Sequence, residues 1–204
     1  ARFEEAASKQ WNIVKDASLS EIRENADGSV TVVAKHTTEN GEELLEIPAD
    51  AVLVATGRRP NTDTLNAKNY FDVQDGGQLS VDKYQRVLYN GAPVPGVYAL
   101  GDVSSRYQLK HVANHEARVV QHNLSHPEDL RASDHRYVPA AVFSNPQIAV
   151  VGMTEEQARQ AAEREGFEIT VKAQNFGDTA YGWAMEDKIG PVSYTHLTLP
   201  TICS

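Results

Sequence analysis

Alternation of apolar and polar residues is the main pattern in the first quarter of the chain. It recurs in three runs, residues 21–23, 30–35 and 44–47. Two polar segments, 25–28 and 39–42, separate the runs and contain Asp-Gly and Asn-Gly, pairs typical of hairpin turns. A period of two predicts strands, so we expect an antiparallel three-stranded meander. Before it, we expect the end of a helix over 2–10 and a short strand over 11–14.

Two later apolar runs each end at a glycine turn. Residues 51–55 (AVLVA) are continuously apolar and lead into Gly57, which predicts a strand buried on both faces. Residues 97–100 (VYAL) predict a second apolar strand that leads into Gly101. Between these two runs the pattern is rich in loops, with a short strand expected over 79–81.

Helical spacing of apolar residues appears twice in the second half of the chain. Residues 109–124 place valines and alanines at intervals of three and four, which predicts a helix. Residues 154–164 predict another, because Thr154 and Gln157 form a capping box and Gly166 follows its end. The remaining elements are a polar linker over 126–136 and three strands, 138–142, 147–151 and 168–173.

Composition and charge exclude several classes of protein. The formal charge is −9, and this argues against a nucleic-acid partner, which needs a basic face. No apolar run approaches the roughly 20 residues of a membrane span. Cys203 is the single cysteine, so no disulfide forms within the chain, and a reducing, cytoplasmic location is expected.

The last thirteen residues, VSYTHLTLPTICS, differ from the rest of the chain. They carry no Asp, Glu, Lys or Arg, although the region before them is rich in charge. The string VSYTHLTLPT resembles the translation of a transposase-end sequencing adaptor. We therefore expect residues 191–204 to be a non-native tail, in which His196 and Cys203 have no chemical role. The alternative is a threonine-rich strand with a proline break.

Gly101 and Asp102 form the first candidate site. An apolar strand brings a carboxylate to its carboxyl end, where ligands bind in open α/β sheets. Gly101 leaves room for a cofactor, and Asp102 can accept hydrogen bonds from ligand hydroxyls. The helix expected from Leu109 would place its free N–H groups nearby, where they stabilise negative charge. The alternative is an aspartate that caps a helix or stabilises a turn.

The segments ATGRRPN and ALGDVSSRYQLKHVANHEA together resemble the pyridine nucleotide-disulfide oxidoreductases, which include glutathione reductase and lipoamide dehydrogenase. The resemblance covers residues 2–190. It implies that Asp102, in the Gly101 turn, binds the ribityl chain of FAD. It also implies that Gly57 lies near the nicotinamide cofactor. The helix start that packs on the flavin corresponds to Gln108, Leu109, Lys110 and His111.

The fold that this resemblance implies is α/β, part of a flavoprotein with two dinucleotide-binding domains. Residues 1–57 are then the end of the NAD(P)-binding domain with its β-meander. Residues 58–126 are the late part of the FAD-binding domain. Residues 127–190 are the start of an α+β dimerisation domain, so a homodimer is expected through the region from Pro139.

The activity that the resemblance implies is electron transfer from NADPH through FAD and a redox-active disulfide to a small disulfide substrate. Three segments, residues 104–124, 126–143 and 181–187, are similar to the branch of the family that reduces mycothione. Other branches stay open: lipoamide dehydrogenase, glutathione reductase-like enzymes, and NADH oxidase or ferredoxin reductase types. A non-enzymatic binding module is a further alternative.

The chemistry-bearing residues of the family are expected outside this sequence. The chain starts in mid-pattern without Met, so we expect a piece of a longer protein. The first FAD fingerprint, the glycine-rich NAD(P) turn and the redox cysteines would precede Ala1. The catalytic His–Glu pair would follow Gly190. No residue of the chain is therefore predicted to be catalytic.

Two other groups of residues suggest sites that we do not favour. His111 and His115 lie four residues apart on one expected helix face, a spacing that suits a metal, but Glu116 follows the second histidine rather than the first. We predict no metal site. Tyr181 and Trp183 resemble a ligand platform, but core or subunit-interface positions are the commoner use of such residues.

Overall fold

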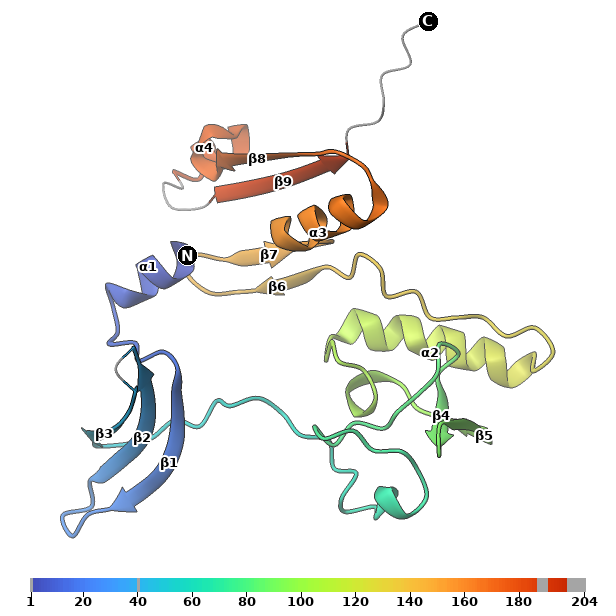
Figure 1. The fold of residues 1–204 in the computed structure, drawn as a ribbon, viewed down its shortest axis with the longest axis horizontal. Coiled ribbons are helices and arrows are strands. Elements are labelled where there is room, and N and C mark those ends of the chain that lie inside the picture. The colour runs from blue at the N-terminus through green and yellow to red at the C-terminus, as the bar shows by residue number, and fades with distance from the viewer. Residues whose placement is uncertain (1, 40, 187–190, 198–204) are drawn as a thin grey trace, which may run out of the picture. The chain divides into compact units, whose positions relative to one another are not determined.

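The computed structural model describes residues 2–39, 41–186 and 191–197, drawn in colour in Figure 1. The chain divides into two compact units, Ala1–Gly57 and Arg58–Ser204. Every strand pair within the described ranges is antiparallel. In this part of the chain, all helices are too short or too polar to cross a bilayer.

The first unit is a helix followed by a three-stranded meander (Figure 1). Its elements are α1 (Arg2–Ser8), β1 (Ala17–Glu24), β2 (Val30–Thr38) and β3 (Gly41–Ala49). The central strand, β2, supplies the buried residues Val33 and Ala34. The meander and the helix are confirmed, because alternation and tight turns are local signals that need no distant partner.

Two strands predicted in this unit are absent from it. Residues 11–14 are irregular and exposed. Residues 51–55, predicted as a strand buried on both faces, are also irregular, and Leu53 is 91% exposed. A strand exists only where a neighbour accepts and donates its backbone hydrogen bonds, and no described segment pairs with either run.

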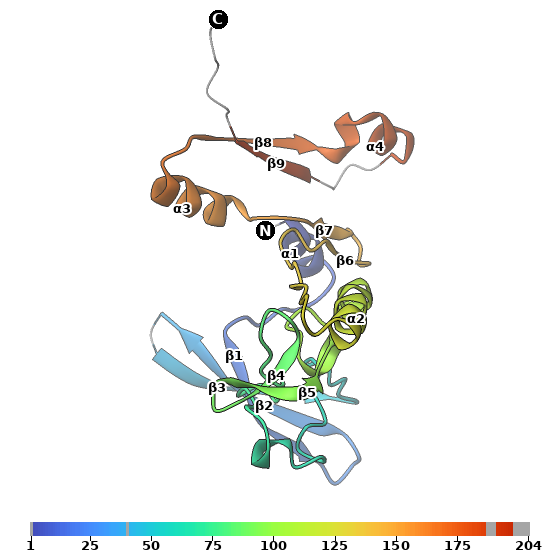
Figure 2. The ribbon, with the colours of Figure 1, turned by 90° about the vertical axis from the view of Figure 1, so that its right-hand side faces the viewer.

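The first part of the second unit contains loops with a short 3₁₀ turn, then a small β-hairpin and a long helix. Its elements are η1 (Ala67–Asn69), β4 (Arg86–Tyr89), β5 (Ala92–Tyr98), η2 (Gly101–Val103) and α2 (Lys110–Ser125). Helix α2 lies beside the hairpin in both views (Figures 1 and 2). The core residues of this region are Val87, Ala99, Val112, Val119 and Val120. The predicted helix is thus confirmed, and its valines face the core as their spacing required.

The strand predicted over 79–81 is reduced to isolated bridges. Leu79 pairs with Val73, and Val81 pairs with Val87, but no continuous ladder forms. The strand predicted over 97–100 belongs to β5, which begins earlier and ends at Tyr98. Among the described strands it pairs only with β4, the strand just before it in the sequence, and the two form an antiparallel hairpin.

The polar segment after α2 is docked rather than loose. Fully buried Asn123 donates to the carbonyls of Tyr84 and Arg131, both at 3.0 Å, and accepts from the Arg131 N–H at 2.7 Å. Farther along, the Ser133 N–H donates to the Lys83 carbonyl at 2.8 Å, and Gln85 Nε2 donates to Ser133 Oγ at 3.0 Å. Residues 131–133 are therefore fixed against the hairpin and the end of α2.

The last part of the second unit holds short strands and three short helical segments. They are β6 (Ala140–Val142), β7 (Ile148–Val150), α3 (Glu155–Glu165), β8 (Ile169–Asn175), η3 (Phe176–Asp178), α4 (Ala180–Ala184) and β9 (Pro191–Leu197). The capping box of α3 forms as predicted, and Gly166 ends the helix with φ +75°. Strand β9 pairs with β8. The segment is thus a strand, as the alternative to a non-native tail predicted. Pairing does not identify the origin of a segment, so the non-native tail stays a prediction.

Candidate functional site

The turn at Gly101 and Asp102 connects the β4–β5 hairpin to α2. Leu100 is extended, and Gly101 then takes φ +69° and opens the single 3₁₀ turn η2. The N–H groups of Ser104 and Ser105 close the turn by donating to the Gly101 carbonyl at 3.0 and 2.7 Å. Gly101 is buried and Asp102 is exposed, so the turn presents one carboxylate to its surroundings.

Gly101 is needed here for two reasons. Its left-handed backbone favours glycine, and a Cβ atom at this position would lie only 3.3 Å from the Cβ of Ala113 on α2. The space expected for a cofactor beside Gly101 is thus occupied by helix α2. The direct part of Gly101 in cofactor binding stays a prediction, while its packing role follows from the geometry.

Buried Glu116 holds the same turn from α2. Its side chain is 1% exposed, and Oε2 accepts a hydrogen bond from the Gly101 N–H at 2.6 Å. Oε1 accepts from Nε2 of His135 at 2.9 Å. Neither Glu116 nor His135 was predicted from the sequence to be part of the site. Glu116 could have been found from its spacing, because it lies on the same helix face as Val112 and Val120. A charged residue on a buried face needs a hydrogen-bond partner.

The Asp102 carboxylate is available to a ligand. Its nearest cation is Arg58, with Nη1 at 3.7 Å from Oδ2. The two side chains are 52% and 80% exposed, and exposed ion pairs of this kind stabilise by only about 0–1 kcal/mol. A ligand that offers hydroxyl donors can therefore replace the arginine at little cost.

The first turn of α2 is open as well. Leu109 is its N-cap residue in extended conformation, and no side chain caps the helix. Lys110 and His111 are exposed, Gln108 and Leu109 are half-buried, and Gln108 has φ +48°. A helix N-terminus without a cap leaves N–H groups and the positive end of the dipole free for an acceptor.

The structure brings together six of the seven predicted site residues. Gly101 contacts α2, and residues 108–111 form the start of that helix, so these positions and Asp102 lie in one region of the second unit. Gly57 belongs to the other unit, where it ends an exposed segment with φ +99°, and a Cβ atom at this position would have nothing within 4 Å. Its place near a nicotinamide cofactor stays a prediction.

A hollow beside the turn is lined by polar residues. It encloses about 400 Å³, and its walls include Gln85, Ser104, Ser105, Glu116 and His135. Among the described residues, two buried side-chain oxygens lack a hydrogen-bond partner, Gln85 Oε1 and Ser104 Oγ, and both belong to this wall. Buried polar atoms are normally satisfied, so this wall has capacity to hold water or another polar group.

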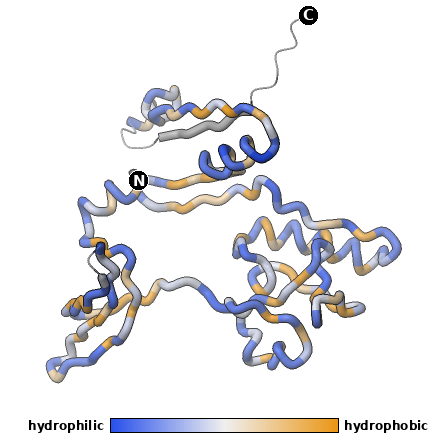
Figure 3. The backbone as a smooth tube through the Cα atoms, in the orientation of Figure 1, coloured by the Kyte–Doolittle hydropathy of each residue, from blue (hydrophilic) through white to orange (hydrophobic). Residues whose placement is uncertain are grey.

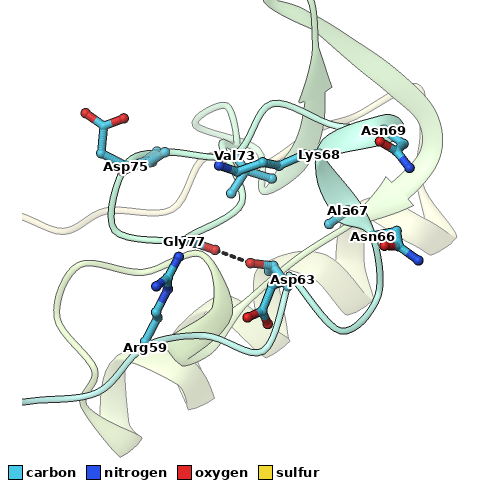
Figure 4. A pocket seen from close by; sticks show the side chains of 11 residues that line it. Arg59, Asp63, Asn66, Ala67, Lys68, Asn69, Val73, Asp75 and Gly77 are labelled. Atoms are coloured by element: carbon cyan, nitrogen blue, oxygen red, sulfur yellow. Dashed lines mark hydrogen bonds between the residues drawn. The ribbon is translucent and has the colours of Figure 1, made fainter.

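A second hollow, of about 250 Å³, lies among the loops before the hairpin (Figure 4). The bond from Thr62 Oγ1 to the Gly77 carbonyl, 2.5 Å long, closes one side. Arg59 and Lys68 line it together with Asp63 and Asp75, so its charges balance. None of the predicted site residues lines this hollow. Because it has two positive and two negative side chains, its net charge favours neither anionic nor cationic ligands.

Comparisons with known proteins cover nearly all of the chain. The sequence profile "Pyridine nucleotide-disulphide oxidoreductase" matches residues 3–117, and the profile of the dimerisation domain of the same family matches residues 138–195. A mycothione reductase of Mycobacterium tuberculosis is 47% identical over 196 residues, which are 94% of this chain and 39% of that protein. The chain thus spans about two fifths of the length of this relative.

Other relatives carry different names. A dihydrolipoyl dehydrogenase of Haloferax volcanii is 43% identical over 142 residues, 68% of this chain and 27% of that protein. Among solved structures, an HOCl-induced flavoprotein disulfide reductase from Escherichia coli superposes with a TM-score of 0.66 at 28% identity, covering 87% of this chain and 37% of that one. The predicted α/β flavoprotein fold with the start of a dimerisation domain is confirmed by these matches.

Proposed function

Because the chain belongs to the pyridine nucleotide-disulphide oxidoreductase family, we propose that the complete gene product is an FAD-dependent enzyme that reduces mycothione with NADPH. The observation that carries the proposal is the exposed Asp102 carboxylate on a rigid turn next to the uncapped start of α2. One group accepts hydrogen bonds and the other donates them. This pair suits a ligand that has both hydroxyl groups and an electron-rich edge.

The residues present fit FAD in chemical terms. Asp102 would accept hydrogen bonds from the ribityl hydroxyls, and Gln108, Leu109, Lys110 and His111 would lie against the flavin. The free N–H groups of the first turn of α2 would stabilise negative charge on the ring system. When bound, FAD would supply two-electron transfer between a nicotinamide and a disulfide. The chain's own part is to hold and polarise the cofactor.

The choice of mycothione rests on sequence similarity. The mycothione reductase relative is 47% identical over 94% of this chain, whereas the dihydrolipoyl dehydrogenases match shorter parts of it or match at lower identity. The choice of NADPH rests on the resemblance to the same branch. The low cysteine content of the chain supports a reducing, cytoplasmic location.

A homodimer through the region from Pro139 is part of the proposal. The dimerisation profile matches residues 138–195. Large apolar side chains are exposed along this region: Val142, Phe143, Val150, Val151, Met153, Tyr181, Trp183 and Met185. Figure 3 shows the apolar stretches of β6 and β7 in orange. Exposed apolar surface of this extent is typical of a surface that a partner covers.

The proposed domain boundaries follow the earlier expectation. The NAD(P)-binding part ends at Gly57, which would admit the nicotinamide cofactor, and the FAD-binding part covers 58–126. The dimerisation part covers 127–190. The division of the chain after Gly57 supports the first boundary. The dimerisation match, residues 138–195, begins inside the third part and does not fix its first residue.

The test is a turnover assay on the complete gene product. We expect a yellow preparation that oxidises NADPH when mycothione is added, and more slowly with NADH, lipoamide or glutathione disulfide. A colourless protein that binds no added FAD would contradict every flavoenzyme assignment. A yellow protein that prefers lipoamide would retain the family and overturn the substrate.

A further inference from the structure

Glu116 is the most completely buried charged residue in the described part of the chain, and the cofactor site proposed above does not include it. Its carboxylate spans two donors that belong to different segments. The Gly101 N–H lies 2.6 Å from Oε2, and His135 Nε2 lies 2.9 Å from Oε1. A carboxylate out of water is costly unless such donors satisfy both oxygens, and here both are satisfied.

The first of these bonds acts on the turn that carries Asp102. Gly101 contacts two successive turns of α2, through the approach to Ala113 and through the bond to Glu116. Its own carbonyl is used by Ser104 and Ser105. The backbone on both sides of Asp102 is therefore fixed, while the exposed Asp102 side chain has, among the described residues, only the long contact with Arg58.

The second bond ties the turn to the segment that precedes the dimerisation match. His135 is held twice, since the Tyr107 hydroxyl donates to its carbonyl at 3.2 Å and the two rings lie 5.5 Å apart. Its neighbour Asp134 donates its N–H to His115 Nε2 at 3.2 Å. His135 is thus a fixed donor that holds the far side of the Glu116 carboxylate.

We propose that Glu116 is a positioning residue that fixes the Gly101-Asp102 turn to the His135 segment and so sets the place of the Asp102 carboxylate. Glu116 does not contact the cofactor itself; it acts through the Gly101 N–H. The consequence for FAD affinity rests on the proposed function. The mechanical claim, that Glu116 immobilises the turn, does not.

The experiment compares Glu116→Gln with Glu116→Leu in the complete gene product. Glutamine keeps an oxygen acceptor for the Gly101 N–H, whereas leucine fills the space without one. Glu163→Leu on the exposed face of α3 is the matched control for the loss of a helical glutamate. Amide hydrogen exchange is read at residues 101–105, and the dissociation constant of FAD is measured on the apoprotein.

We expect Glu116→Leu to speed exchange at Gly101 by about tenfold or more, which corresponds to the loss of one buried hydrogen bond to a charged group. Exchange elsewhere should be unchanged, and FAD should bind about tenfold more weakly. Glu116→Gln should stay near the parent in both readouts. His135→Gln, a half-buried substitution, should also speed exchange at Gly101, and it serves as the second variant if Glu116→Leu does not fold.

Unchanged exchange at Gly101 in Glu116→Leu, or in His135→Gln where Glu116→Leu does not fold, would overturn the proposal. So would a uniform rise in exchange across α2 and the hairpin, which indicates a general structural role. If the parent binds no FAD, the proposed function fails, while the exchange arm still decides whether Glu116 positions the turn.

Discussion

Gly101 lies so close to Ala113 of α2 that a Cβ atom on Gly101 would be 3.3 Å from the Cβ of Ala113. That distance is tighter than ordinary van der Waals contact, and Gly101 also has φ +69°. The turn that carries Asp102 therefore requires glycine at position 101.

Gly101→Ala should lower the free energy of unfolding by about 1–2 kcal/mol from the left-handed backbone alone, and further from the contact with Ala113. Gly96→Ala is the matched control, because Gly96 has φ +74° and nothing within 4 Å of its Cβ position. Urea unfolding of both variants measures the difference. Equal losses in the two variants would show that the Ala113 contact has no cost.

Asn123→Ala should lower the free energy of unfolding by about 2–3 kcal/mol, because it removes three hydrogen bonds that hold the backbone groups of Tyr84 and Arg131. Gln121→Ala, on the exposed side of the same helix, should change stability little. Thermal unfolding followed by circular dichroism compares the two. A loss in Asn123→Ala no greater than in Gln121→Ala would contradict the docking of residues 131–133.

Arg136→Gln should raise the pKa of Asp134. Hydrogen bonds from the Arg136 guanidinium, and then from its backbone N–H, hold the pKa of this carboxyl well below its ordinary value of 3.8. A lowered pKa in the folded state means that the pair stabilises above the ordinary value and that this stability is lost as the pH falls. A carboxyl NMR titration measures the shift, with Arg118→Gln as the control; an unmoved pKa would rule out the pair in solution.

The origin of residues 191–204 can be tested on the DNA itself. We predict that the gene, sequenced again from genomic template, departs from the printed sequence after Gly190. The prediction rests on the charge-free string VSYTHLTLPT and its likeness to a translated adaptor. A genomic read that continues with the same codons through Ser204 would refute it and would make β9 (Pro191–Leu197) a native strand.

Local patterns predicted the elements whose partners are adjacent in the sequence. The meander, α2 and the capped helix α3 each follow from alternation, helical spacing or a capping box within about 20 residues. The runs 11–14, 51–55 and 79–81 were predicted as strands, and they lack a continuous ladder in the described structure. A strand is defined by its neighbour, and an apolar run alone does not supply one.

The sequence predicted only those parts of the candidate site whose residues are adjacent in the chain. Gly101 and Asp102 are adjacent in one turn and follow an apolar run, so both can be recognised from the sequence. Glu116 and His135 are separated by 19 residues and meet only in the fold. A glutamate and an asparagine on the valine face of α2 were the available signal, because polar residues at buried helix positions require partners.

The central claim is that Asp102 holds a flavin cofactor, and its most direct test is the dissociation constant of FAD for the apoprotein of the complete gene product. Asp102→Ala removes both acceptor oxygens of the carboxylate, and Asp75→Ala is the control at an exposed position. Loss of a hydrogen bond to a charged group costs about 1.5–3 kcal/mol, so the constant should rise roughly tenfold to a hundredfold. Equal FAD affinity in Asp102→Ala, Asp75→Ala and the parent would contradict the account.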